Sequence, residues 1–296
     1  MAGLAPPNTW YNILKAAKHF NQPRKNQYGI LIGTKSDGYA EQVFTQFALS
    51  NGARQFDKDG KLVFNSQAMT ETVEFYNELQ QYSPTGPQPW RERDYYLQGK
   101  MAMFFYSTYI MDDLALAKVA ASSLTGDNFE LLSGGTFDPD LVKNTKMVSS
   151  FKNTQESSYG VIVTLGITKN DDVKKTNAAK RLVSYLYEED AYVSFLHMAP
   201  GGMNPVIRSV ARSSKFMNDP KGIFKHYGKD KMYEIIAGLD NLQKFEIVEG
   251  KMIPASGEIF AKQIIPQMLY KTHFEGSSVK NAMNWAEGEM NKIVNK

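Results

Sequence analysis

Residues 159–168 impose the strongest constraint on the fold, because they read Tyr-Gly-Val-Ile-Val-Thr-Leu-Gly-Ile-Thr without a single charge. A short apolar run rich in β-branched residues is typical of a strand buried on both faces. We therefore predict a strand here. Because few other segments read as strands and most read as helices, the sequence favours an α/β or α+β fold with helix layers on a sheet.

Periodicity and turn signals place the remaining elements. Thr9 and Ser66 are suited to cap the helices that follow them, and Asp59-Gly60 suits the tip of a hairpin. Strands are predicted at residues 28–32 and 100–106, a hairpin at 56–64, and helices at 10–20, 39–49, 66–82, 108–121, 171–188, 190–198, 206–212, 220–237, 259–271 and 277–295.

Length and composition exclude several classes of protein. The 296 residues are enough for about two domains or one large one, and 42% are apolar, as in a globular protein. The net charge of +3 is too small for a protein that binds nucleic acid by neutralising many phosphates. The absence of cysteine excludes thiolate catalysis, iron–sulfur clusters and disulfides. Apolar uncharged stretches such as residues 157–168 and 101–111 are too short to span a bilayer.

Motifs of catalysis are missing from the sequence. The four histidines, at 19, 197, 226 and 273, are too far apart to form a metal-binding pair on one helix. Walker A, dinucleotide-binding and nucleophile-elbow patterns are absent as well. We therefore expect no catalytic residue, no metal and no cofactor, and the sequence favours a binding protein.

Aromatic residues supply the positive signal. They make up 12% of the chain, with 17 Phe, 16 Tyr and 3 Trp. Aromatic rings stack on the apolar faces of sugars, while tyrosine hydroxyls form hydrogen bonds. This composition is compatible with carbohydrate binding, although most such rings fill protein cores.

Several motifs in register resemble those of one family. These are Pro7-Asn8-Thr9-Trp10 at a helix opening, Ser50-Asn51-Gly52 before the hairpin, Gly99-Lys100-Met101-Ala102-Met103, Gly201-Gly202-Met203-Asn204-Pro205 and the closing helix after Gly276. Together they make the chain similar to the extracellular solute-binding proteins of ABC importers, the group that includes maltose-binding protein.

The resemblance implies the type II periplasmic-binding-protein architecture, with two α/β lobes closing on a solute. Residues 1–157 would form the first part of the C-terminal lobe. Residues 158–216 would form a hinge strand and a return segment of the N-terminal lobe, and 217–296 the helices of the C-terminal lobe. The chain opens at a helix that lies inside family members, without a signal peptide, so we expect the second lobe to be largely complete and the first to be truncated.

The same resemblance implies function and site residues. The protein would be a monomeric binding component, in the periplasm or anchored as a lipoprotein, that delivers a carbohydrate to membrane permease subunits. The implied ligand-binding residues are Asp37, Tyr39, Ser107, Tyr109, Tyr159, Gly160 and Gly202. Tyr109 would stack on the sugar in place of the tryptophan that the family often has there.

Two alternatives remain open at this stage. The chain could be a carbohydrate-active enzyme, which would need a carboxylate pair with one raised pKa. It could also be a non-functional remnant with an exposed apolar lobe face. Trp10, Trp90 and Trp285 are interpreted as packing residues.

Overall fold

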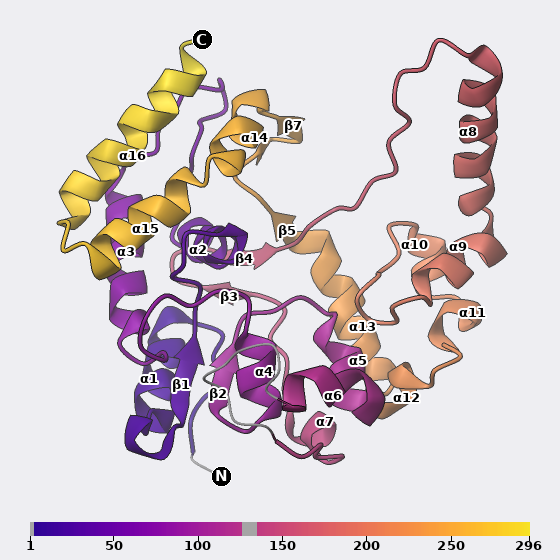
Figure 1. Ribbon diagram of the computed structural model, residues 1–296, viewed down its shortest axis with the longest axis horizontal. Helices are drawn as coiled ribbons and strands as arrows, with labels where there is room; N and C mark the ends of the chain where they lie inside the picture. Colours follow the sequence, from indigo (N-terminus) through magenta and orange to yellow (C-terminus); the bar gives the residue numbers. More distant parts are fainter. Residues whose placement is uncertain (1–2, 126–134) are drawn as a thin grey trace.

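Helices surround a few short strands in the computed structural model, which describes residues 3–125 and 135–296 (Figure 1). Up to residue 159 the elements are α1 (Trp10–Phe20), the 3-10 helix η1 (Pro23–Lys25), β1 (Tyr28–Leu31), α2 (Gly38–Ser50), α3 (Gln67–Gln80), α4 (Glu92–Leu97), β2 (Met101–Phe104), α5 (Ile110–Ala115), α6 (Ala117–Thr125), α7 (Leu141–Asn144), β3 (Phe151–Lys152) and β4 (Glu156–Tyr159). Beyond it they are α8 (Val173–Leu186), α9 (Glu189–Leu196), α10 (Arg208–Ala211), α11 (Ser214–Met217), α12 (Ile223–Tyr227), α13 (Lys229–Gly238), the 3-10 helix η2 (Leu239–Asn241), β5 (Leu242–Gln243), β6 (Ile247–Val248), β7 (Lys251–Met252), α14 (Pro254–Ala261), α15 (Ile264–Phe274) and α16 (Val279–Val294). Within the described ranges, no helix is both long and apolar enough to cross a membrane.

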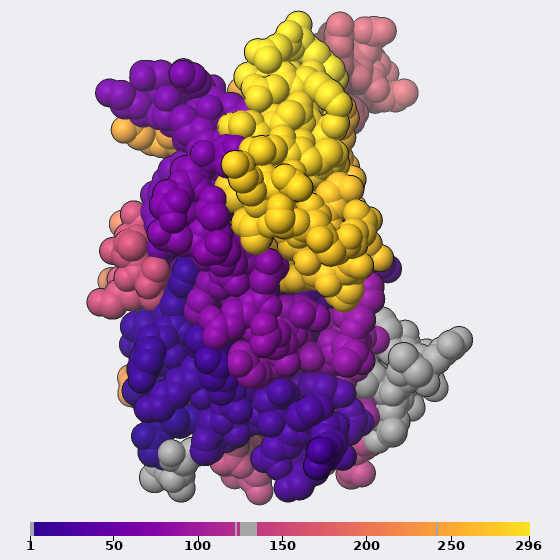
Figure 2. Space-filling model, turned by 90° about the vertical axis from the view of Figure 1, so that its left-hand side faces the viewer, coloured from indigo at the N-terminus to yellow at the C-terminus, as the bar shows by residue number. Residues whose placement is uncertain are grey.

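The largest apolar core joins the two ends of the chain. Helices α1, α2 and α3 share it with α14, α15 and α16, around the strand pair β1–β2. Figure 2 shows α15 and α16, in yellow, lying against the indigo and purple N-terminal part. At its centre, fully buried Phe47 contacts the rings of Trp10, Phe75, Tyr76, Phe105 and Phe151.

Side-chain caps confirm several predicted helix starts. The Thr9 hydroxyl accepts the backbone N–H of Asn12 at 3.2 Å, and the Ser66 hydroxyl accepts that of Met69 at 3.3 Å. Each cap satisfies a donor that the first helical turn leaves unpaired, which contributes about 1 kcal/mol. The apolar positions of these helices face the core, as their periodicity predicted.

Strands β1 and β2 pair in parallel, with Tyr28 opposite Met101 and Leu31 opposite Phe104. Gly29 allows α1 to lie directly against this pair, since a Cβ atom there would stand 1.9 Å from the carbonyl oxygen of Ala17. Because parallel strands run in the same direction, the loops that follow β1 and β2 leave from the same edge.

Two smaller apolar clusters hold the rest of the helices together. One joins Met111 to α9 and to the segment 210–235, and the other joins Ile110 and Leu114 to α4, α6 and α7. Helix α5 therefore lies between both clusters. The first cluster contains residues on both sides of position 216, where we predicted a domain boundary.

Three helices predicted as continuous are each divided. The prediction for 259–271 is corrected to the end of α14 and most of α15, because Gln263 between them has φ of 52°, outside the helical range. The prediction for 108–121 is corrected to α5 and α6, because Leu116 adopts an extended backbone. The prediction for 220–237 is corrected to α12 and α13, because Gly228 between them has φ of 78°, a conformation that ends a helix. The predicted hairpin at 56–64 is reduced to one bridge, between Phe56 and Leu62.

The strand predicted at 159–168 is wrong beyond Tyr159. Strand β4 ends there, and residues 160–172 form no helix or strand. In Figure 1 this segment and α8 extend away from the rest of the molecule. A strand exists only through hydrogen bonds to a neighbour, and no described strand pairs with residues 160–168.

His273 in α15 should make stability depend on acid pH. Its Nε2 atom is buried without a partner, and burial lowers the pKa of His273 to about 4, from 6.5. Between these values the unfolded chain binds a proton that the folded chain does not, so stability falls as pH drops. The loss from pH 6.5 to 4 should approach about 3 kcal/mol, since each pKa unit is worth about 1.4 kcal/mol.

Urea denaturation between pH 7 and 4.5 measures this dependence. The His273→Phe variant keeps a ring beside Tyr76, whose centroid lies 6.0 Å away, and should lack this part of the pH dependence. His19→Gln, at an exposed position of α1, is the control and should follow the unmodified chain. Equal pH slopes for His273→Phe and the unmodified chain would contradict the assignment.

Candidate functional site

The loops that follow β1 and β2 bring predicted site residues to one edge of the molecule. Asp37 lies between β1 and α2, and residues 105–109 lie between β2 and α5. The hydroxyl of Tyr39, in the first turn of α2, donates to the carbonyl of Phe105 at 3.0 Å, which joins the start of α2 to the loop after β2. In α/β proteins, ligands bind at the carboxyl ends of parallel strands, which is where these loops begin.

Asp37 stabilises the start of helix α2 at this edge. Its Oδ1 accepts the backbone N–H groups of Tyr39 at 3.0 Å and Ala40 at 3.2 Å, so it caps α2. Burial raises the pKa of Asp37, against the lowering effects of those two N–H groups and of Lys35. Because the side chain is only half-buried, the other carboxylate oxygen is the one available to a ligand.

Tyr39 is buried, with 1% of its surface exposed, so its ring cannot stack on a ligand and instead packs against another aromatic ring. That ring is Trp90, whose centroid lies 4.8 Å from the centroid of Tyr39. The ring of Tyr106 packs edge-to-face against Trp90, with the two centroids 6.4 Å apart. Trp90 itself is 43% exposed. The interpretation of Trp90 as a packing residue is therefore incomplete, and its place in a Pro- and Gly-rich loop was the sequence signal for exposure.

Tyr109 and Gly202, predicted from distant parts of the sequence, are in contact. A Cβ atom on Gly202 would come within 2.2 Å of the Tyr109 ring, so only glycine lets the ring lie against this backbone. Tyr109 remains 45% exposed. Exposed Ser107 accepts the Tyr109 backbone N–H at 3.4 Å, and Asn204 donates to the Thr108 hydroxyl at 2.9 Å.

Tyr159 and Gly160 lie at the end of β4, in a second group. Tyr159 pairs in register with Gln243 of β5, and the Lys244 ammonium lies 5.8 Å from the centre of its ring. Burial raises the pKa of Tyr159, with smaller effects from Glu246 and from Glu41 of α2. A cavity of about 490 Å³ adjoins Gly160 and Ile162. It is lined as well by residues 242–245, residues 247–249 and part of the 49–58 segment.

Buried carboxylates behind the aromatic rings were not predicted. Glu92, at the start of α4, has no exposed surface, and neither of its carboxylate oxygens has a hydrogen-bond partner. Burial raises the pKa of Glu92 to about 8 and that of Asp113 to about 7. Arg93 lies 3.7 Å from Asp113 and partly offsets that effect. Sequence spacing carries no signal for this cluster, because α4 and α5 meet only in the fold.

The arrangement resembles one wall of a binding site more than a reaction centre. Two exposed rings, Trp90 and Tyr109, flank a loop that carries the Ser107 hydroxyl, with the Asp37 carboxylate on the neighbouring loop. Rings and polar groups of this kind can bind a polyhydroxy compound. Among residues 3–125 and 135–296, no three His, Asp or Glu side chains gather as ligands for a metal ion.

Comparison with known sequences identifies the family. The family of bacterial extracellular solute-binding proteins matches residues 1–193. A putative ABC transporter periplasmic-binding protein of Escherichia coli K12, YcjN, is 24% identical over 298 aligned residues. The match covers 99% of this chain and 62% of YcjN, so the chain spans less than two thirds of that relative.

Solved structures share the fold. Maltose-bound MalE3 of T. maritima superposes with a TM-score of 0.66 at 16% identity, over 98% of this chain and 66% of its own. A solute-binding protein of Thermotoga lettingae with α-D-tagatose gives 0.67 at 18%, over 98% and 65%. One of Agrobacterium radiobacter K84 with ribitol gives 0.67 at 18%, over 99% and 66%. The expected α/β fold of two-lobe solute-binding proteins is confirmed, and the chain belongs to the bacterial extracellular solute-binding protein family.

Proposed function

We propose that this chain supplies one wall of the carbohydrate site in the binding component of an ABC importer. The observation that carries the proposal is the placement of exposed Trp90 and Tyr109 beside Ser107 and Asp37, at the carboxyl ends of β1 and β2. Membership of a solute-binding family supports it.

The proposed ligand class is a neutral polyhydroxy compound, either an oligosaccharide or a polyol. Flat rings suit the apolar faces of such molecules, and polar groups at the rim fix their orientation. Structures that share the fold are described with maltose, ribitol, D-mannitol and laminaribiose, which supports this class. Tyr159, Gly160 and Gly202 complete the proposed set of ligand-binding residues. Gly202 contributes by letting the Tyr109 ring lie against its backbone.

The proposed mechanism is closure of two lobes around the solute, after which the closed protein docks on membrane permease subunits outside the cytoplasm. In this proposal residues 158–187 form a hinge strand and a return segment of the other lobe. The predicted boundary at 216 moves to the start of α9, because α9 and Phe216 pack in one cluster with Met111 and Ile223, so residues 1–157 and 188–296 belong to one lobe. A ligand that contacts both walls binds the closed form more tightly and so shifts the population toward it. The protein acts as a monomer in this scheme.

Binding without turnover is favoured over hydrolysis by the burial of Glu92. Glycoside hydrolysis needs a protonated carboxyl within reach of the scissile bond. Glu92 has the raised pKa of such an acid, about 8, but no exposed surface. Incubation with maltose and laminaribiose, followed by mass spectrometry, should therefore return the sugars unchanged.

Tyr109→Ala tests the proposed site. We expect the dissociation constant for a bound sugar to rise by about tenfold or more, since 1.4 kcal/mol of lost contact is tenfold. The midpoint of thermal unfolding should barely move, because the ring is 45% exposed. Isothermal titration of the longer protein that contains both lobes, with maltose, laminaribiose, ribitol and mannitol, measures the affinity.

Tyr233→Ala is the matched control, because Tyr233 in α13 is 42% exposed and lies outside the proposed site. It should leave affinity unchanged. Equal affinities for Tyr109→Ala and the unmodified chain, or absence of binding to the whole panel, would overturn the proposal. Asp37→Ala is a poorer probe, because loss of the α2 cap would itself destabilise the protein by about 1 kcal/mol.

A further inference from the structure

The beginning of the chain is cationic, which the small net charge of the whole chain does not reveal. Residues 1–36 contain no Asp or Glu, so all 31 acidic residues lie beyond them. The same stretch includes Lys15, Lys18, Arg24 and Lys25. These four basic residues belong to α1 and to the 3-10 helix η1 that follows it, so their charges are gathered at one place in the fold.

The outer side of α1 presents these charges together with aromatic rings. Tyr11, Lys15 and Lys18 recur at intervals of four and three residues and so share one side of the helix. Ile13 and Ala17 are buried on the opposite side. Tyr11 is 70% exposed, and Phe20 at the end of the helix is 38% exposed. We define the α1 basic surface as the exposed residues Tyr11, Lys15, Lys18, Phe20, Arg24 and Lys25.

The turn that carries Arg24 and Lys25 is held in place by backbone hydrogen bonds. The N–H of Gln22 donates to the carbonyl of Gln27 at 2.8 Å, and the N–H of Gln27 donates back at 3.3 Å. The N–H of Lys25 donates to the carbonyl of Gln22 at 2.8 Å. The two basic side chains therefore extend from a closed turn directly beyond the end of α1.

Most of this charge is not neutralised within the protein. The Nζ atom of Lys18 lies 3.0 Å from Oε1 of Glu78 in α3. None of the described carboxylates forms an ion pair with the other three basic residues of the surface. The Lys15 ammonium instead lies 6.0 Å from the centre of the Tyr11 ring. The α1 basic surface therefore attracts an anionic partner.

The extent and the composition of the surface indicate which partner fits. Tyr11 and Phe20 are nine residues apart, which spreads the surface over about 14 Å of helix. A row of this length suits a plane of many anionic groups better than one small anion. Exposed aromatic rings beside Lys and Arg are typical of proteins that lie at the boundary between water and lipid. An anionic lipid surface strengthens binding by about fivefold for each Lys or Arg near it.

We propose that the α1 basic surface binds an anionic phospholipid bilayer. The basic side chains contact the lipid headgroups, and the rings of Tyr11 and Phe20 lie at the same level. In Figure 1, α1 lies at the lower left and α5 and α10 lie to the right, so the bilayer does not cover the edge that carries Tyr109 and Gly202. The proposal does not rest on the proposed function, because it uses no residue of that site and is tested without a sugar.

Sedimentation of the whole chain with vesicles measures this binding. The chain should bind phosphatidylcholine vesicles that contain phosphatidylglycerol, and it should not bind vesicles of phosphatidylcholine alone. Binding should be lost at 1 M salt, where charges are screened beyond about 3 Å. The triple variant Lys15→Gln, Arg24→Gln, Lys25→Gln should lower the partition coefficient about a hundredfold, from three losses of about fivefold. Its thermal unfolding should be unchanged, because all three side chains are exposed.

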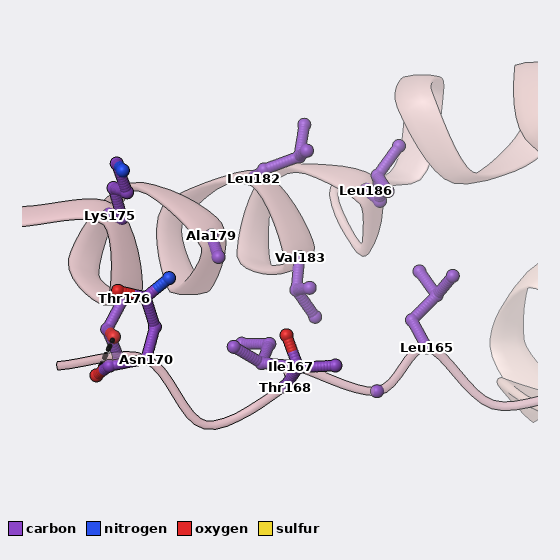
Figure 3. A pocket seen from close by; sticks show the side chains of 11 residues that line it. Leu165, Ile167, Thr168, Asn170, Lys175, Thr176, Ala179, Leu182, Val183 and Leu186 are labelled. Carbon is purple, nitrogen blue, oxygen red and sulfur yellow. Dashed lines mark hydrogen bonds between the residues drawn. The ribbon is translucent and has the colours of Figure 1, made fainter. Parts of the chain in front are cut away.

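Helix α8 offers the matched control, because it loses the same charge at another exposed place. Lys174, Lys175 and Lys180 are exposed, and Figure 3, which shows the cavity between α8 and residues 165–170, has Lys175 pointing away from that segment. Acidic residues at 171–172 and 188–190 flank this helix and offset its charge. The triple variant Lys174→Gln, Lys175→Gln, Lys180→Gln should therefore bind the vesicles as the unmodified chain does.

The Tyr11→Trp variant distinguishes a lipid surface from a soluble polyanion. On vesicles with phosphatidylglycerol, the emission of the new indole should shift to shorter wavelength, because the ring moves from water to the headgroup region. Polyglutamate, which has negative charge but no apolar layer, should leave that emission unchanged. A chain that bound polyglutamate as tightly as the vesicles, without any shift on either, would have an acidic polypeptide as its partner and would overturn the proposal.

Three other results would also overturn the proposal. One is that the chain does not sediment with phosphatidylglycerol vesicles at low salt. Another is that the α1 and α8 triple variants weaken binding equally, since the position of the charges would then not matter. The third is binding that needs no phosphatidylglycerol and is lost in a Val163→Asp variant, because the exposed apolar residues between 161 and 167 would then make the contact.

Discussion

Replacing Gly29 by alanine should lower the free energy of unfolding by about 3 kcal/mol or more, at or beyond the upper end of the usual range for overpacking in a core. The added Cβ would stand 1.9 Å from the Ala17 carbonyl oxygen and 2.6 Å from its carbonyl carbon. These are backbone atoms inside α1, so no side-chain rotation can relieve the contact. The helix must shift away from β1, which opens the core that Phe47 and its neighbours fill.

Chemical denaturation measures this loss directly. Gly288→Ala is the matched control, because Gly288 lies inside α16 with no atom near its missing Cβ. Alanine there should raise stability by about 0.5–1 kcal/mol through its higher helix propensity. A Gly29→Ala variant as stable as the unmodified chain would show that α1 and β1 pack less closely than described.

Replacing Glu92 by glutamine should stabilise the protein at alkaline pH. Burial raises the pKa of Glu92 to about 8 from 4.5, so between these values the folded chain holds a proton that the unfolded chain has lost. The stability contributed by the buried neutral acid is complete below pH 4.5 and is lost as pH rises through 8. Over this window the loss is on the order of 4–5 kcal/mol.

Glutamine has nearly the same shape and does not ionise, so the stability difference between variant and unmodified chain should grow with pH. Measurement between pH 6.5 and 8.5 avoids the opposite effect of His273, which acts below pH 6.5. The exposed Glu74→Gln is the control and should give no such trend. A difference between Glu92→Gln and the unmodified chain that stayed constant across this range would contradict the buried neutral state.

Helices α1, α2, α3 and α16 of the main core could be predicted from the sequence because their signals are local, whereas the break between α14 and α15 was missed. Thr9, Ser66 and Ser278 cap the helices that follow them, and apolar residues recur along each buried face. The prediction of a strand at 159–168 failed because a strand depends on a partner that is distant in the sequence. The composition of this segment is that of a buried strand, but no strand in residues 3–125 or 135–296 pairs with it, and a strand needs such a partner.

The candidate site was predictable only in part. The resemblance selected the loop 105–109 and Gly202, and the structure places Tyr109 on Gly202. It selected Tyr39 as a ring for stacking, whereas the fold buries that ring and exposes Trp90. Which of two neighbouring rings reaches solvent depends on how α2 and the loop before α4 meet, and spacing along the chain does not contain that information. Roles in ligand binding remain predictions.

The contact between Gly202 and the Tyr109 ring lowers the entropy cost of binding for any solute that stacks on that ring. A ring held against backbone on one side has few rotamers left to lose when its other face is covered. Immobilising a free side chain at an interface costs about 0.5–1.5 kcal/mol, and this ring avoids most of that entropy loss. If Tyr109 binds the solute as proposed, its ring is therefore preorganised, and a bulkier residue at position 202 would displace the ring, so that each solute would have to order it on binding.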